Sequence, residues 1–189
     1  MSAQLFIGAE AGAYNPLDYS TIKVGLVSDY QLLPSMSIHS ELVYIEKLVN
    51  LPLDVVFPEE DFRNHEINYF KIPITFQLKL NIHRVSAKLM LGPYWAYGLG
   101  ISAIEKDSGE RQSFDFSAIS VNRMDFGAVI GGGFEILIAK GRKMFVDFRY
   151  NVGLMDIDHI NSVNSYNEGS AITMGILLPL RTNMKKKEE

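Results

Sequence analysis

Apolar and polar residues alternate with a period of two along residues 69–80. Every second side chain is apolar, and the series is Phe70, Ile72, Ile74, Phe76, Leu78 and Leu80. The intervening positions include Lys71, Thr75, Gln77 and Lys79. Because successive side chains of a β-strand point to opposite faces, this pattern predicts a strand with one apolar and one polar face. A strand of about ten residues is also long enough to cross a bilayer when tilted.

The same alternation recurs in seven further segments. They are residues 5–13, 22–31, 36–48, 85–101, 123–139, 144–154 and 172–180. No segment sustains the i, i+3, i+4, i+7 spacing of an amphipathic helix. The links alternate between long and short, and the even number of strands places both termini on one side. The pattern therefore predicts an all-β fold, an eight-stranded antiparallel up-and-down transmembrane β-barrel, because closure leaves no strand edge unpaired.

The polar faces of the predicted strands carry acids and bases in equal number. The acids are Glu10, Asp29, Glu41, Asp125, Glu135 and Asp147, and the bases are Lys23, Lys71, Lys79, Lys88, Arg123 and Arg149. Charges inside a narrow barrel must be paired, whereas charges in water need no partner. The balance therefore predicts that the polar faces line the lumen as a charge network. The apolar faces then point outward, as in outer-membrane barrels.

Aromatic residues on the apolar faces gather near predicted strand ends. They are Tyr30, Tyr44, Trp95, Tyr97 and Tyr150. Tyrosine and tryptophan concentrate where a membrane meets water, because their rings are amphipathic. These five residues are therefore expected to be interfacial aromatics.

Length and charge narrow the class of protein. The chain has 189 residues, which suits one barrel domain over residues 1–181 followed by a polar tail over residues 182–189. The net charge of −4 argues against nucleic acid as a partner. There is no apolar run of about 18 residues that would form a transmembrane helix. No signal peptide is visible in the sequence, but residues 2–4 resemble the boundary left by signal cleavage, and export is an expectation on that basis.

Four motifs occur in order over most of the chain: YFKIPI at 69–74, LGPY at 91–94, DFGAVIGGGFE at 125–135 and RYNVGL at 149–154. The series resembles the PorT-like group, the small outer-membrane β-barrel family of Bacteroidetes-type bacteria. This resemblance implies a location in the bacterial outer membrane and no catalytic activity. A founding member of the group is associated with the protein-secretion system of gliding bacteria.

Two other functions deserve comparison with this interpretation. Ser37, His39 and Glu41 share one polar face, and such residues form hydrolase triads in barrels that deacylate lipid A. Chemistry on lipid must face the lipid, whereas these side chains are expected to face the lumen, so no catalytic residue is assigned. The second alternative is a soluble lipocalin-like carrier, which would bury the apolar faces and expose the charges.

No cofactor or metal site is assigned from the sequence. Asp156, Asp158, His159 and Glu168 could hold a hard cation, but their spacing matches no known loop motif, and a solvated loop is the preferred interpretation. The expected function is a monomeric, non-enzymatic outer-membrane barrel with a closed, salt-bridged lumen. It would serve as a membrane scaffold, in surface recognition or as a secretion accessory. Its partners would be outer-membrane lipid, lipopolysaccharide and a protein bound by the long loops.

Overall fold

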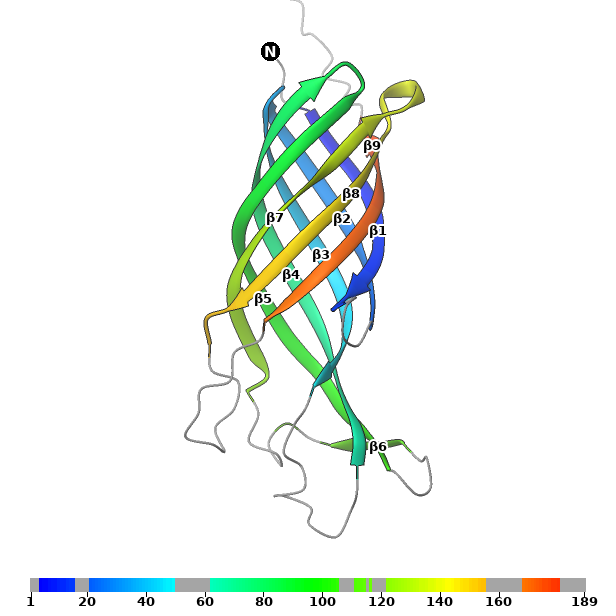
Figure 1. Cartoon of the computed structure of the whole chain (residues 1–189), viewed down its shortest axis with the longest axis vertical. Helices are drawn as coiled ribbons and strands as arrows, with labels where there is room; N and C mark the ends of the chain where they lie inside the picture. Colours follow the sequence, from blue (N-terminus) through cyan, green and yellow to red (C-terminus); the bar gives the residue numbers. More distant parts are fainter. Residues whose placement is uncertain are drawn as a thin grey trace, which may run out of the picture.

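The computed structural model describes residues 4–15, 21–49, 62–105, 111–114, 116, 122–155 and 168–180. These residues form nine β-strands and one short 3-10 helix (Figure 1). The strands are β1 (Gln4–Tyr14), β2 (Thr21–Leu33), β3 (Met36–Val49), β4 (Phe62–Ile82), β5 (Val85–Glu105), β6 (Arg111–Phe114), β7 (Met124–Leu137), β8 (Lys143–Gly153) and β9 (Gly169–Pro179). The predicted tail at residues 182–189 lies outside the described part of the chain.

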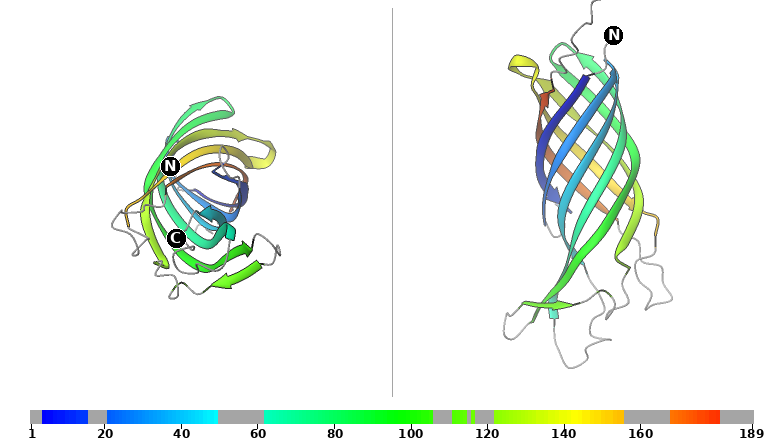
Figure 2. Two further views of the ribbon diagram at one scale, coloured as in Figure 1. Left: turned by 60° about the horizontal axis from the view of Figure 1, so that its bottom comes forward. Right: turned by 180° about the vertical axis from the view of Figure 1, so that it is seen from behind.

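Eight of these strands close into an antiparallel barrel. Each pairs with the next in the order β1, β2, β3, β4, β5, β7, β8, β9, and β9 pairs with β1. Figure 2 shows the closed wall from behind and towards one end. The prediction of an eight-stranded up-and-down barrel is therefore confirmed. No helix in the described residues is long and apolar enough to span a membrane.

Short turns join the strands at one end of the barrel. They follow β2, β4 and β7, and the last of them contains the 3-10 helix η1 (Ala139–Gly141). His83 and Lys140 adopt positive φ angles there, which lets the chain reverse within a few residues. The first barrel strand begins and the last barrel strand ends at this same end, where Leu180 donates its backbone N–H to the carbonyl oxygen of Leu5. We call this end the short-turn mouth and the opposite one the loop end.

Strands β4 and β5 extend further than the sequence pattern indicated. Each has 21 residues, whereas the alternation supports residues 69–80 and 85–101. The long links expected between segments 36–48 and 69–80 and between segments 85–101 and 123–139 are therefore wrong in part. Strand β4 begins inside the first link, and the second link contains β6, which pairs with β5. Polar residues interrupt the alternation beyond the barrel wall, but backbone pairing needs no alternation. The start of β4 and the end of β5, which pair with each other at the open end of the β4–β5 hairpin, therefore project past the other barrel strands at the loop end (Figure 1).

Burial confirms which face of each strand is inside. The charged residues at every second position of the strands are buried in the lumen. Large apolar side chains at the positions between them, such as Leu91 and Phe126, are exposed on the outer wall. A lipocalin-like carrier requires the reverse arrangement, so the structure contradicts that alternative. In water this outer wall would be unfavourably exposed, whereas in a bilayer it contacts lipid chains.

A glycine on β1 allows the barrel to close tightly on β9. A Cβ atom added at Gly8 would overlap the backbone carbonyl oxygen of Ile176. We expect Gly8→Ala to lower the free energy of unfolding by ~1–3 kcal/mol, because the two backbones must separate. Urea unfolding followed through Trp95 fluorescence measures this change. A matched control is Gly100→Ala, since a Cβ there meets no described atom within 4 Å, and an equal loss in both variants would contradict the prediction.

Candidate functional site: the lumen charge network

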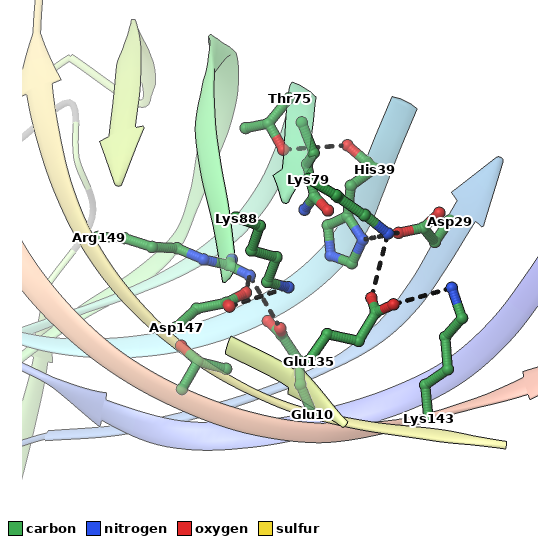
Figure 3. Close-up of polar contacts among 12 residues, drawn as sticks. Glu10, Asp29, His39, Thr75, Lys79, Lys88, Glu135, Lys143, Asp147 and Arg149 are labelled. Carbon is green, nitrogen blue, oxygen red and sulfur yellow. Dashed lines mark hydrogen bonds and ion pairs between the residues drawn. The ribbon is translucent and has the colours of Figure 1, made fainter. Parts of the chain in front are cut away.

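Alternate residues of seven barrel strands send charged side chains into the lumen. In the described part of the chain the buried acids are Glu10, Asp29, Glu41, Asp125, Glu135 and Asp147, and the buried bases are Lys23, Lys71, Lys79, Lys88, Lys143 and Arg149. Figure 3 shows many of them pointing toward one another from different strands. We call this set, together with His39, the lumen charge network.

Arg149 on β8 occupies the middle of the network. Its guanidinium contacts a carboxylate oxygen of Glu41, and it also lies 2.8 Å from Asp147 and 3.5 Å from Glu10. Lys23 completes this centre, with its Nζ 2.7 Å from Glu10 and 3.2 Å from Glu41. Each carboxylate of Glu10 and Glu41 therefore has two cationic partners. Such pairing compensates the large cost of removing these charges from water.

A second group of contacts lies toward the short-turn mouth. Lys79 Nζ is 2.9 Å from Asp29 and 3.1 Å from Glu135. Lys143 Nζ lies 2.9 Å from the other oxygen of Glu135. Lys88 belongs to the central group around Arg149, because its Nζ lies 2.9 Å from a carboxylate oxygen of Asp147. These pairs join β2, β4, β5, β7 and β8 across the lumen.

His39 on β3 connects the two groups. Its Nδ1 lies 3.7 Å from Asp29, its Nε2 lies 3.3 Å from Glu41, and its ring packs edge-on against Phe145 with the centroids 6.0 Å apart. The residue is fully buried. Sequence reasoning assigned His39 to a satisfied lumen network but not to this bridging position. The available signal was its spacing of two residues from Glu41 on the same face.

A third group lies nearer the loop end. Lys71 Nζ sits 3.4 Å above the centre of the Tyr94 ring and 2.6 Å from the side-chain oxygen of Asn151. The Tyr94 hydroxyl donates a hydrogen bond of 2.9 Å to Asp125. Tyr94 and Asn151 were not predicted as site residues. Tyr94 contacts both Lys71 and Asp125, and Asn151 offers Lys71 an oxygen acceptor, so both buried charges have partners in this group.

Arg123 is not buried in the lumen, which corrects the sequence-based assignment. It is exposed, it precedes the first residue of β7, and its guanidinium carbon lies 5.1 Å from the centre of the Phe116 ring. Lys143, which lies between the predicted segments 123–139 and 144–154 and was not assigned to the charge network, is buried in the lumen. Alternation identified the correct face for Arg123, but the strand begins one residue too late to carry it inside. The exchange leaves six acids and six bases among the buried described residues.

Packing between the central group and the loop-end group closes the lumen. Tyr14, Val43, Ile45 and Ala171 form a buried apolar cluster there. The cavity beside it has a volume of about 10 Å³, which is roughly the space for one water molecule. In the described part of the chain, the barrel interior is therefore filled by side chains.

The contacts of Ser37 differ from those of a catalytic triad. Its hydroxyl lies 3.3 Å from a carboxylate oxygen of Asp29 and 3.5 Å from the side-chain oxygen of Gln77, and it can donate its one proton to either, while His39 lies against Asp29 and Glu41. Ser37 and His39 are both fully buried. A nucleophilic serine needs a hydrogen bond to its base and access to substrate, so this geometry favours a structural role.

One group of potential metal ligands is present among the described residues. Glu10, His39 and Glu41 each offer a ligand atom, and these atoms lie within 4.8 Å of one another. Both carboxylates already contact Lys23 and Arg149, which supply the positive charge that an ion would bring. Of the loop residues weighed as cation ligands, Asp156, Asp158 and His159 lie outside the described residues. Glu168 accepts a hydrogen bond of 2.8 Å from Tyr150.

The five predicted interfacial aromatics all lie on the outer side of the wall, but not at one level. Tyr44, Tyr97 and Tyr150 are on the loop-end halves of their strands, Trp95 is the central residue of β5, and Tyr30 is near the short-turn mouth. Trp95 and Tyr97 stack with ring centroids 6.1 Å apart. Phe70, which was not predicted, packs edge-on against Tyr44 at 6.2 Å.

Comparison with known proteins gives one family and several solved structures of similar fold. Residues 9–159 match the family model described as outer membrane protein beta-barrel domain. A search of curated proteins found no match. Solved structures with similar folds include three outer-membrane proteins from different bacteria.

The first of these is a major outer membrane protein from Thermus thermophilus, with TM-score 0.62, 11% identity and coverage of 95% of this chain and 100% of that one. Neisserial surface protein A has TM-score 0.57 and 12% identity, covering 94% and 99%. The N-terminal β-barrel domain of Pseudomonas aeruginosa OprF has TM-score 0.54 and 13% identity, covering 95% and 100%. Identities this low establish a shared fold and leave the function open.

Proposed function

The chain belongs to the family of outer membrane protein beta-barrel domains, and we propose that it is a monomeric, non-enzymatic scaffold that presents its loop end for recognition. In this proposal the barrel resides in the bacterial outer membrane among phospholipid and lipopolysaccharide. The short-turn mouth faces the periplasm, and the loop end faces outward, where it contacts a protein partner.

The observation that carries the proposal is the filled lumen. Buried ion pairs cross the barrel between strands far apart in sequence, such as β3 and β8 or β4 and β7. Eight strands enclose a space just wide enough for side chains. Passing a solute would require breaking several of these pairs, each of which is costly to leave unpaired. A transport role is therefore poorly supported, and a scaffold role fits the packing.

The projecting open end of the β4–β5 hairpin supports recognition at the loop end. Each strand has 21 residues, which corresponds to roughly 70 Å of extended chain, and even at a tilt near 45° this exceeds the ~30 Å hydrocarbon thickness of a bilayer. The loop-end part of β4 and β5 carries its own packing, because Ile67, Ile101 and Phe116 are buried there. A structured extension of this kind offers a fixed surface to a partner.

Two finer assignments belong to the same proposal. Membership of the PorT-like group of Bacteroidetes-type bacteria is supported by the four ordered motifs, which include YFKIPI at 69–74 on β4 and RYNVGL at 149–154 on β8. A role accessory to protein secretion would follow from that membership. A lipid-hydrolase role is not proposed, because Ser37 and His39 are enclosed by the lumen wall and have no path to lipid.

The test is reconstitution of the purified chain in a planar bilayer, together with incubation on lipid A. We expect no discrete conductance steps, because the lumen is filled, and no loss of acyl chains by mass spectrometry. A heat-modifiable gel band verifies that the reconstituted chain is folded, and boiled protein provides the blank. Reproducible open-channel steps would contradict the sealed scaffold, and acyl-chain release would contradict the non-enzymatic assignment.

A further inference from the structure

The short-turn mouth contains a cavity that the proposed function does not use. Its volume is about 290 Å³, near the lower limit of small-molecule pockets. Its wall includes Phe6, Gln31, Lys79, Arg84, Glu135 and Lys143. The ion pairs of Lys79 and Lys143 with Glu135 form part of its wall, and Figure 3 shows them side by side. We call it the mouth cavity.

Positive charge exceeds negative charge on the wall of the mouth cavity. Lys79, Lys143 and Arg84 line it as cations, whereas Glu135 is its lining carboxylate. Asp29, the other partner of Lys79, lies deeper in the lumen and is not part of the wall. A recess bounded by low-dielectric protein strengthens the field of such an excess. The cavity is therefore electrostatically suited to an anion.

Both lysines retain capacity for a further acceptor. An ammonium group has three donors. Among the described residues, Lys79 Nζ donates to Asp29 and Glu135, and Lys143 Nζ contacts Glu135 at 2.9 Å and Gln31 at 3.5 Å. Arg84 adds a planar guanidinium at the exposed rim, a group that binds phosphate through two parallel hydrogen bonds.

The walls of the mouth cavity are held by hydrogen bonds between neighbouring turns. The Asn81 side chain donates to the carbonyl of Pro34 at 2.7 Å and accepts from Ser86 at 2.6 Å. The backbone N–H of Leu137 donates to the carbonyl of Arg84 at 2.7 Å. A ligand would thus meet an arrangement already formed, which lowers the entropic cost of binding.

We propose that the mouth cavity binds a phosphate group through Arg84, Lys79 and Lys143. Phosphate matches the combination of a guanidinium fork and two point charges better than a neutral ligand does. Phe6, Pro34 and Leu137 also line the cavity, so the ligand is a phosphate ester whose organic part contacts these apolar groups. The site lies at the opposite end from the loops and goes beyond the scaffold function.

The first experiment is calorimetric titration of the full chain, folded in zwitterionic detergent, with inorganic phosphate and with sn-glycerol 3-phosphate. We expect saturable binding that Arg84→Gln and Lys143→Gln each weaken about tenfold, as the loss of one charge-assisted hydrogen bond does. Lys140→Gln is the matched control, because it removes one exposed cation at the same end without lining the cavity. It is expected to change the affinity less than about twofold.

Two results would overturn the proposal. One is the absence of saturable binding to a chain whose gel mobility shows that it is folded. The other is a loss in Lys140→Gln as large as in Arg84→Gln, which would indicate diffuse attraction rather than a site. Arg84 is exposed, so Arg84→Gln keeps the test valid even where Lys143→Gln impairs folding. Conductance in the planar bilayer would contradict the scaffold function, but it would not affect the result for phosphate binding at the mouth cavity.

The source of the phosphate is decided by a second arm in nanodiscs. The chain is reconstituted with mixed phosphatidylglycerol and phosphatidylcholine, and retained lipid is identified by native mass spectrometry. Selective retention of phosphatidylglycerol that Arg84→Gln abolishes supports a lipid headgroup. Binding of sn-glycerol 3-phosphate without such retention supports a soluble phosphate ester. Failure of both probes contradicts the site.

Discussion

Replacing Arg149 with methionine is expected to lower the free energy of unfolding by ~3–5 kcal/mol, the usual cost of removing one partner from a buried ion pair. Arg149 contacts three carboxylates, those of Glu10, Glu41 and Asp147. Without it, Lys23 and Lys88 must neutralise these groups in a lumen that is filled by side chains. Urea titration of the chain folded in phospholipid vesicles, monitored through Trp95 fluorescence, measures the loss.

The matched control is Arg123→Met, because sequence alternation assigned both arginines to the same network. Arg123 is exposed and packs over Phe116, so its replacement should cost less than ~1 kcal/mol. A double variant, Arg149→Met with Glu41→Gln, removes one of the three carboxylates that lose Arg149 as a partner and should recover part of the stability. Equal losses for Arg123→Met and Arg149→Met would show that the buried network does not stabilise the barrel.

Placing an arginine at Leu91 is expected to cost ~2–4 kcal/mol when the barrel is folded in phospholipid vesicles, as charges do on the lipid face near the bilayer midplane. Leu91 is 60% exposed and lies between Phe76 and Ile130 on neighbouring strands, both also exposed. It sits near the middle of the apolar stripe of β5, between Val85 and Tyr97. The cost comes from moving a cation out of water, since no side chain is displaced. Vesicle urea titration again gives the change.

Ile82→Arg provides the comparison for depth. Ile82 is 59% exposed, close to the value for Leu91, but it is the last residue of β4 beside the short turn. There an arginine reaches headgroups and water, and the expected cost is ~0–1 kcal/mol. If both variants lost the same stability, or neither did, the outer wall would not be a membrane-spanning surface.

Alternation along the chain was sufficient for the main features of the barrel. The number of barrel strands and the face of each that lines the lumen follow from a period of two, which is a local property of extended chain. Their antiparallel order follows from the alternation of long and short links and from closure of the sheet. Eleven of the twelve predicted charges, all except Arg123, are buried inside. Each of these features depends on near neighbours in sequence, and this is why the amino-acid sequence alone was informative.

The ends of the strands and the pairing of β6 could not be predicted from alternation. Whether Arg123 enters the lumen depends on where β7 starts, and Lys143 enters because β8 begins with it. The extension of β4 and β5, and the addition of β6, depend on backbone pairing between segments whose side chains carry no alternating pattern. The sequence contains no local signal for either.

The amino-acid sequence by itself therefore determined that this protein is an eight-stranded barrel with polar residues inside and apolar residues outside. Only the tertiary structure decided that His39 joins two groups of charges, that Arg149 serves three carboxylates, and that the short-turn mouth collects Arg84, Lys79 and Lys143 around one cavity. The physical reason is distance. A period of two assigns each side chain to a face, whereas contacts across the lumen depend on the register and tilt of strands up to 150 residues apart, as between Lys23 and Thr173.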